Sequence, residues 1–175
     1  MFLSSSEISS RLVSDLRLGL PIILHDANTY FLTAAIETLY SEKLDKIMEI
    51  AKNENFEIAI TNRRAKVLNV RIYNESVTRI SIRERVSIQL LQAIADPSKD
   101  LDYPLKGPFQ SERNGKFNVA SVSLSLCKKA RLLPASILVN IPKSIRDELV
   151  SSQISESDIG DLKIKHEETK FLPNL

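Results

Sequence analysis

The sequence is poor in the residues that build several common kinds of site. Cys127 is the single cysteine among 175 residues, so neither an intrachain disulfide nor a cysteine-based zinc site can form within the chain. There are four glycines, and they form neither a Walker pattern nor a dinucleotide-binding fingerprint. Because no disulfide is possible within the chain, a reducing compartment is the expected one, and we predict a cytoplasmic location.

Long apolar runs and an excess of one charge are also missing. No run approaches the roughly 20 residues of a membrane span, and the start, MFLSSSEISSRLVSDL, lacks the basic and apolar parts of a signal peptide. Lysine and arginine number 24 against 22 acidic residues, a balance that calls for neither nucleic acid nor a membrane as a partner. This composition is that of a soluble globular protein. We expect one domain, residues 1–150, and a polar tail or linker at 151–175.

The stretch from Phe117 to Ile141 organises the rest of the chain. Its first part predicts a helix, because apolar residues recur at spacings of three and four. Pro134 cannot continue that helix, and the apolar run 137–141 that follows is typical of a strand buried on both faces. The apolar face of the predicted helix consists of Val119, Val122, Leu126, Ala130 and Leu133.

The remaining pattern alternates between helices and strands. Ser4 and Glu7 form a capping box at the start of a helix that Gly19 ends. Further helices are predicted near 41–51, 62–69, 86–95 and 142–150, and strands at 20–24, 30–36, 56–60 and 77–82, with a turn at 25–28. Residues 98–115 are expected to form an irregular loop. This order predicts an α/β protein of the α+β type, in which a mixed β-sheet is layered with helices.

Four segments, in this order along the chain, carry a resemblance: LRLGLPIIL (16–24), ITNRRAKVL (60–68), ADPSKDLDYPLKGPF (95–109) and KKARLLPASILV (128–139). Together they are similar to the synthase-like N-terminal domain of the long GTP cyclohydrolase II proteins of some bacteria, which is the closer match. Three segments, DLRLGLPIILHD (15–26), SIRERVSIQLLQAIADP (81–97) and ARLLPASILVNI (130–141), resemble 3,4-dihydroxy-2-butanone 4-phosphate synthase itself, an enzyme of riboflavin biosynthesis. The resemblance covers roughly residues 10–150 and implies the mixed sheet of that family and a homodimer.

The resemblance also implies where a synthase would carry its chemistry. Asp26 matches an aspartate of the family, but the Arg-Glu pair of the same loop is absent from residues 25–29. Val119, Ala120 and Ser121 stand where the family has His-Thr-Glu, and Asn140 stands in place of a glutamate. A magnesium ion and a general base would lack their usual groups here, so we expect no catalytic residue, no metal and no cofactor in this chain. The zinc of GTP cyclohydrolase II would belong to a catalytic domain that this chain lacks.

Other candidate groups have ordinary explanations beside the functional ones. Arg63, Arg64 and Lys66 are candidates for binding a phosphate, or alternatively a solvated face or a contact for the acidic surface of a partner domain. His25 and Asp26 could form an acid–base pair or a polar turn. Cys127 is expected to be a small buried hydrophobe.

Three functions follow from these observations. The first is a non-catalytic, synthase-like domain, a pseudoenzyme that dimerises and positions a GTP cyclohydrolase II catalytic domain in cis or in trans. The alternative is a divergent synthase that still converts ribulose 5-phosphate with magnesium. The third is a binding module for a phosphorylated metabolite or nucleic acid, although the composition favours no nucleic-acid partner.

Overall fold

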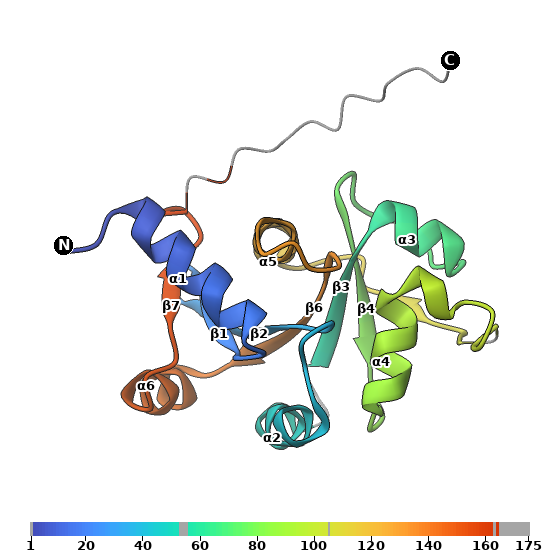
Figure 1. Ribbon diagram of the computed structural model, residues 1–175, viewed down its shortest axis with the longest axis horizontal. Helices are drawn as coiled ribbons and strands as arrows, with labels where there is room; N and C mark the ends of the chain where they lie inside the picture. Colours follow the sequence, from blue (N-terminus) through green and yellow to red (C-terminus); the bar gives the residue numbers. More distant parts are fainter. Residues whose placement is uncertain (1, 53–55, 105, 163, 165–175) are drawn as a thin grey trace, which may run out of the picture.

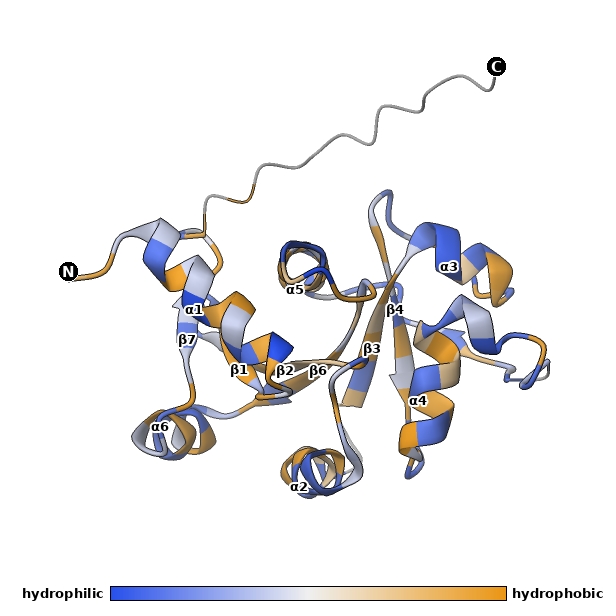
Figure 2. Ribbon diagram, in the orientation of Figure 1, coloured by the Kyte–Doolittle hydropathy of each residue, from blue (hydrophilic) through white to orange (hydrophobic). Residues whose placement is uncertain are grey.

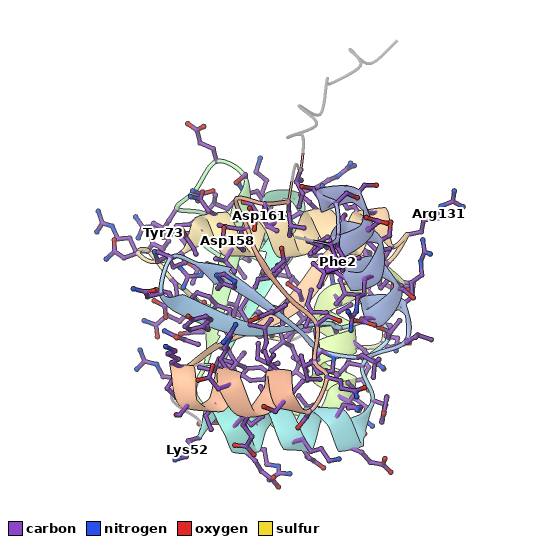
Figure 3. The ribbon with its side chains drawn as sticks, turned by 90° about the vertical axis from the view of Figure 1, so that its left-hand side faces the viewer. Phe2, Lys52, Tyr73, Arg131, Asp158 and Asp161 are labelled. Atoms are coloured by element: carbon purple, nitrogen blue, oxygen red, sulfur yellow. The ribbon has the colours of Figure 1, made fainter. Side chains whose placement is uncertain are left out.

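The computed structural model describes residues 2–52, 56–104, 106–162 and 164, and within them a seven-stranded mixed sheet lies between two layers of helices (Figures 1 and 3). The strand order is β5-β4-β3-β6-β2-β1-β7. All neighbouring strands are antiparallel except β1 and β7, which are parallel. This architecture confirms the predicted fold class. The elements are α1 (Ser5–Arg17), β1 (Ile22–Asp26), β2 (Thr29–Ala35), α2 (Ser41–Ala51), β3 (Phe56–Thr61), α3 (Asn62–Val67), β4 (Val77–Ile82), α4 (Ile88–Ala95), a 3-10 turn (Pro97–Lys99), β5 (Gln110–Ser111), α5 (Phe117–Lys129), β6 (Ala135–Ile141), α6 (Lys143–Ser151) and β7 (Glu156–Asp158).

Strand β6 lies in the middle of the sheet, as the apolar run at 137–141 predicts. It pairs with β2 on one side and β3 on the other. Its side chains alternate between two cores: Ile137 and Val139 pack toward α2 and α4, and Leu138 packs toward α1 and α5. Figure 2 shows the result, with apolar residues along the central strands and polar residues on the outward sides of the helices.

The two helical layers divide by face. Helices α1 and α5 cover one face of the sheet, and α2 and α6 cover the other (Figures 1 and 3). The predicted capping box at Ser4 and Glu7 is present, and Leu12 and Leu16 of α1 are buried against the sheet. In the part of the chain that the structure describes, no helix combines the length and apolar character needed to cross a bilayer.

Helix α5 ends earlier, and faces the core differently, than the sequence pattern predicts. It stops at Lys129, because Arg131 adopts a left-handed conformation (φ 59°). The N–H of Leu132 then bonds to the carbonyl of Cys127 and that of Arg131 to Lys128, which is a Schellman ending without the usual glycine. Pro134 therefore lies beyond the helix end and does not cause it. Val122 is half-buried rather than central to the face, whereas Ala120, Ser123, Leu124 and Cys127 are buried.

The first hairpin also differs from the prediction. His25 and Asp26 belong to β1, where they pair with Tyr30 and Thr29, and are not part of the turn. The reversal is made by residues 27–28, with Ala27 in a left-handed conformation (φ 53°). The side chain of Asp26 is thereby fixed on the α5 face of the sheet, since alternate residues of β1, Ile22 and Leu24, pack in that core.

The segment expected to be a tail contains a strand of the sheet. Residues 156–158 form β7, which pairs with β1, and Leu162 is buried against the α1 side. Arg146 of α6 holds Glu156 by a hydrogen bond from Nε (2.7 Å) and another from its Nη2. Asp158 and Asp161 of this segment face the viewer in Figure 3. Residues 151–162 therefore belong to the fold, whereas residues 163 and 165–175 of the predicted tail lie outside the described residues.

Candidate functional site

A cavity of about 570 Å³ opens on the α5 face of the sheet at the point where α5 begins. Its floor comes from β2, β3, β4 and β6, and one wall from residues 112–116, which lead into α5. Because α5 starts only at Phe117, the strand residues beyond that point have no helix above them. Polar side chains line the cavity beside the apolar Phe31, Phe56 and Ile82, and Asn140 of the central strand is exposed there.

Glu57 and Arg79 form the best-defined interaction in this cavity. Nε and Nη2 of Arg79 donate to the two carboxylate oxygens of Glu57, both at 2.8 Å, and Nη1 donates to the carbonyl of Asn114 at 2.7 Å. The guanidinium also lies over the ring of Phe117, 5.1 Å from its centre. Arg79 is 5% exposed. Through these contacts the guanidinium of Arg79 connects β3, β4 and the start of α5, and it is not free to bind a ligand.

The carboxyl groups of the cavity differ in their electrostatics. Burial raises the pKa of Glu57 above its usual value, the charge of Glu112 acts in the same direction, and Arg79 opposes both. Glu112 itself accepts a 2.5 Å hydrogen bond from the hydroxyl of Ser81. At the rim, Nζ of Lys116 lies 3.5 Å from a carboxylate oxygen of Asp26.

Gly115 is required by this arrangement. Its φ is 116°, and a Cβ built there would lie 2.6 Å from Nη1 of Arg79. A glycine therefore lets the wall of the cavity approach the buried guanidinium closely.

The positions that the resemblance assigned to catalysis lie next to this cavity but differ in access to it. Asn140 lines the cavity. Asp26 does not line it but contacts Lys116, which does. Val119 and Ala120, in the first turn of α5, are fully buried in the apolar core with Leu124 and Leu138. Ser121 is half-buried, and its hydroxyl lies 3.1 Å from that of Ser76.

The predicted phosphate-binding residues are not part of the cavity. Arg63 and Lys66 are exposed on α3, while Arg64 is buried. Arg64 donates to both carboxylate oxygens of Asp100 and to the carbonyls of Ala93 and Ile94. Its guanidinium is therefore occupied within the protein, and Arg63 and Lys66 are the two predicted phosphate-binding residues that stay exposed. Spacing along a short helix could not distinguish Arg64 from its neighbour Arg63.

A magnesium site of the kind that the resemblance implies does not fit the residues present. Magnesium is usually held by one or two carboxylates, but Glu57 is already paired with Arg79 and Asp26 with Lys116, and Glu112 accepts a hydrogen bond from Ser81. Among the residues that the structure describes, no three His, Cys, Asp or Glu side chains are grouped so that they could hold a metal ion. The single thiol contributes nothing, because burial raises the pKa of Cys127 to about 12.

The sequence interpretation missed Glu57, Arg79, Glu112 and Lys116. A signal for the first two was available, since each is a charged residue inside an alternating strand pattern, FEIAIT and VTRISI. Charged residues are almost never buried without a partner, so two such strands indicate a paired charge between neighbouring strands.

Comparison with solved structures identifies the architecture. A two-domain 3,4-dihydroxy-2-butanone 4-phosphate synthase from A. baumannii superimposes with a TM-score of 0.66 and 19% identity, over 88% of this chain and 56% of that one. The Candida albicans synthase gives 0.65 and 14%, over 87% and 94%. A synthase in complex with two magnesium ions gives 0.63 and 12%, over 87% and 93%. This chain has the fold of 3,4-dihydroxy-2-butanone 4-phosphate synthase.

The extent of the match differs between these structures. The chain spans 56% of the two-domain synthase but more than nine-tenths of the single-domain ones. No family model matches the sequence, and no curated protein matches it. At these identities the likeness concerns the fold.

Proposed function

We propose that this chain is a synthase-fold scaffold domain without synthase activity, which forms a homodimer and positions a GTP cyclohydrolase II catalytic domain in riboflavin biosynthesis. The proposed absence of synthase activity is supported mainly by the burial of Val119 and Ala120. Both side chains are fully enclosed in the apolar core at the first turn of α5, beside the cavity. An apolar core position cannot supply a proton or a metal ligand to a substrate in that cavity.

Without a general base and a metal ligand, the transition state of the synthase reaction would lose much of its stabilisation. Forming an enediolate from a sugar phosphate needs a base that takes a proton and a group that stabilises the developing negative charge. Each 1.36 kcal/mol lost from transition-state stabilisation lowers the rate about tenfold. The amide of Asn140 is neutral, and Glu57 is paired with Arg79, so neither replaces both functions.

Formate release tests this part of the proposal. Ribulose 5-phosphate and magnesium are incubated with the protein, with an active synthase assayed in parallel. We expect no formate above the protein-free blank and no rise in Tm on adding magnesium, because an ion that does not bind the native state does not stabilise it. Turnover that disappears in Asp26→Asn would refute the proposal and support the divergent synthase. The cavity's position beside Asp26 and Asn140 is the observation that favours that alternative.

The scaffold role rests on a different observation. One neighbour is a two-domain synthase, of which this chain covers 56%, so in that protein a domain of this fold is joined to a second one. Light scattering should give twice the 19.7 kDa mass of the chain, with an interface above about 1,000 Å² expected for a stable dimer. A GTP cyclohydrolase II protein should co-elute with it. A monomer at high concentration that leaves the cyclohydrolase unbound would refute the scaffold role.

A further inference from the structure

The part of the cavity wall that leads into α5, residues 113–116, is held against the sheet by few polar contacts. We call it the wall segment. It belongs to no helix or strand, and each of its residues is at least partly exposed. Among the described residues, two polar contacts join it to the sheet. Nη1 of Arg79 donates to the carbonyl of Asn114 at 2.7 Å, and Nζ of Lys116 lies 3.5 Å from a carboxylate oxygen of Asp26. The closer contact is therefore made by one buried side chain.

Arg79 is itself held in place by Glu57. Two of its three side-chain nitrogens donate to that carboxylate, and the third donates to the wall segment. The guanidinium also lies over the ring of Phe117, the first residue of α5. A buried charge that loses its partner is strongly destabilising. Neutralising Glu57 therefore favours conformations in which the guanidinium turns to solvent, and these break its bond to Asn114.

The surroundings of Glu57 determine when it becomes neutral. The charged groups that line the same cavity come from β4, from its continuation and from the wall: Arg79, Arg83, Glu112 and Lys116. Strand β6 and the first two turns of α5 contain no titratable side chain. Burial raises the pKa of Glu57, and the charge of Glu112 adds to this effect although Arg79 opposes it. Glu57 therefore takes up a proton at a higher pH than an ordinary glutamate does.

We propose that Glu57 and Arg79 form a latch, which holds the wall segment against the sheet and releases it when the carboxylate is neutralised. In the closed state the pair is formed and Asn114 is bound. As the pH falls, Glu57 takes up a proton, the guanidinium turns outward and the cavity opens further to solvent. The latch thus regulates access to the 570 Å³ cavity, and it does not depend on the scaffold role.

Limited proteolysis with trypsin tests the latch, because the wall segment carries two cleavage sites, after Arg113 and after Lys116. Glu57→Gln removes the charge and keeps a side chain of similar size. We expect cleavage at these two sites to be at least about fivefold faster than in the wild-type protein, because proteolysis follows the population of the locally open chain. Cleavage in α2, after Lys43 and Lys46, measures global unfolding and supplies the reference rate.

Glu112→Gln is the matched control. Glu112 is a carboxylate of the same cavity, but its side chain binds the hydroxyl of Ser81 and not Arg79, and a glutamine still accepts that hydrogen bond. Cleavage of the wall segment should stay within about twofold of the wild-type rate. Equal acceleration in both variants, or none in Glu57→Gln, would overturn the proposal.

A second measurement uses the wild-type protein, so it decides the question even where Glu57→Gln does not fold. NMR follows the exchange with solvent of the Nε–H of Arg79, which donates to Glu57 at 2.8 Å. The reference is the Nε–H of Arg64, which donates to a backbone carbonyl. The other nitrogens of Arg64 bind Asp100, and their hydrogen bonds hold the pKa of that carboxylate well below its usual range. The reference group therefore keeps its partners at a pH where Glu57 is already protonated.

Both Nε–H groups share the intrinsic pH dependence of exchange, so their ratio reports the latch. From pH 7 down to the lowest pH at which circular dichroism shows a folded protein, we expect the protection of Arg79 relative to Arg64 to fall at least about threefold. A constant ratio over that range would overturn the latch. Neither experiment involves dimer formation or a cyclohydrolase, so failure of the latch leaves the scaffold proposal as it stands.

Discussion

Replacing Arg64 with leucine should destabilise the protein strongly, although its neighbour Arg63 should be replaceable at almost no cost. Arg64 donates four hydrogen bonds, two to Asp100 and one each to the carbonyls of Ala93 and Ile94. Its removal leaves Asp100 with Lys106 as a cationic partner and leaves the two carbonyls without a donor from this side chain. Breaking a buried ion pair from one side costs about 3–5 kcal/mol.

The lower end of that range applies here. The side chain of Asp100 is 31% exposed, so solvent recovers part of the lost interaction, and we expect about 3 kcal/mol. For a chain of this length each kcal/mol corresponds to about 2–4 °C, which gives a fall in Tm of about 6–12 °C. Urea unfolding and calorimetry measure both quantities. Arg63→Leu is the control and should stay within about 0.5 kcal/mol.

The pH dependence of the free energy of unfolding provides an independent check on the role of Arg64. Hydrogen bonds from Arg64, and then from Lys106, hold the pKa of Asp100 well below its usual range. The native state therefore binds this proton more weakly than the unfolded state, so the stabilisation is present above about pH 4 and is lost as the pH falls further. The difference between wild type and Arg64→Leu should shrink below pH 4. If Arg64→Leu is no less stable than Arg63→Leu at pH 7, the reasoning is refuted.

Three further predictions concern the sheet and the cavity. Val139→Asp places an unpaired charge in the central strand and should cost about 3–5 kcal/mol; a variant that melts like the parent would contradict the position of β6. Arg79→Met should cost about 3 kcal/mol at pH 7 but less as the pH is lowered, because burial raises the pKa of Glu57 and the variant lacks the guanidinium that opposes this effect; a loss that does not change with pH in urea unfolding would argue against the pair. Gly115→Ala should lower the Tm, since its Cβ meets Arg79 at 2.6 Å; an unchanged Tm would mean that the wall moves freely.

The helices and strands could largely be predicted from the sequence, because their signals are local. Alternation in β3, the capping box of α1 and the apolar run in β6 each identify an element without knowledge of its neighbours. The end of α5 could not be predicted in this way. Pro134 is the obvious breaker, but the helix stops at Lys129 because Arg131 takes a left-handed conformation in a Schellman ending. Likewise β7 is three residues of polar sequence that become a strand only by pairing with β1.

The site shows the same division more clearly. Val119, Ala120 and Asn140 are visible in the sequence, and their side chains determine which chemical groups are present at these positions. The pairing of Glu57 with Arg79 was decided by the register of β3 and β4, which brings together two charges 22 positions apart. The roles of Arg63 and Arg64 were decided by the orientation of α3, which turns one guanidinium to solvent and the other into the protein. Composition and spacing determine which groups a chain possesses, but only tertiary packing determines which of them are already paired and which remain free to bind.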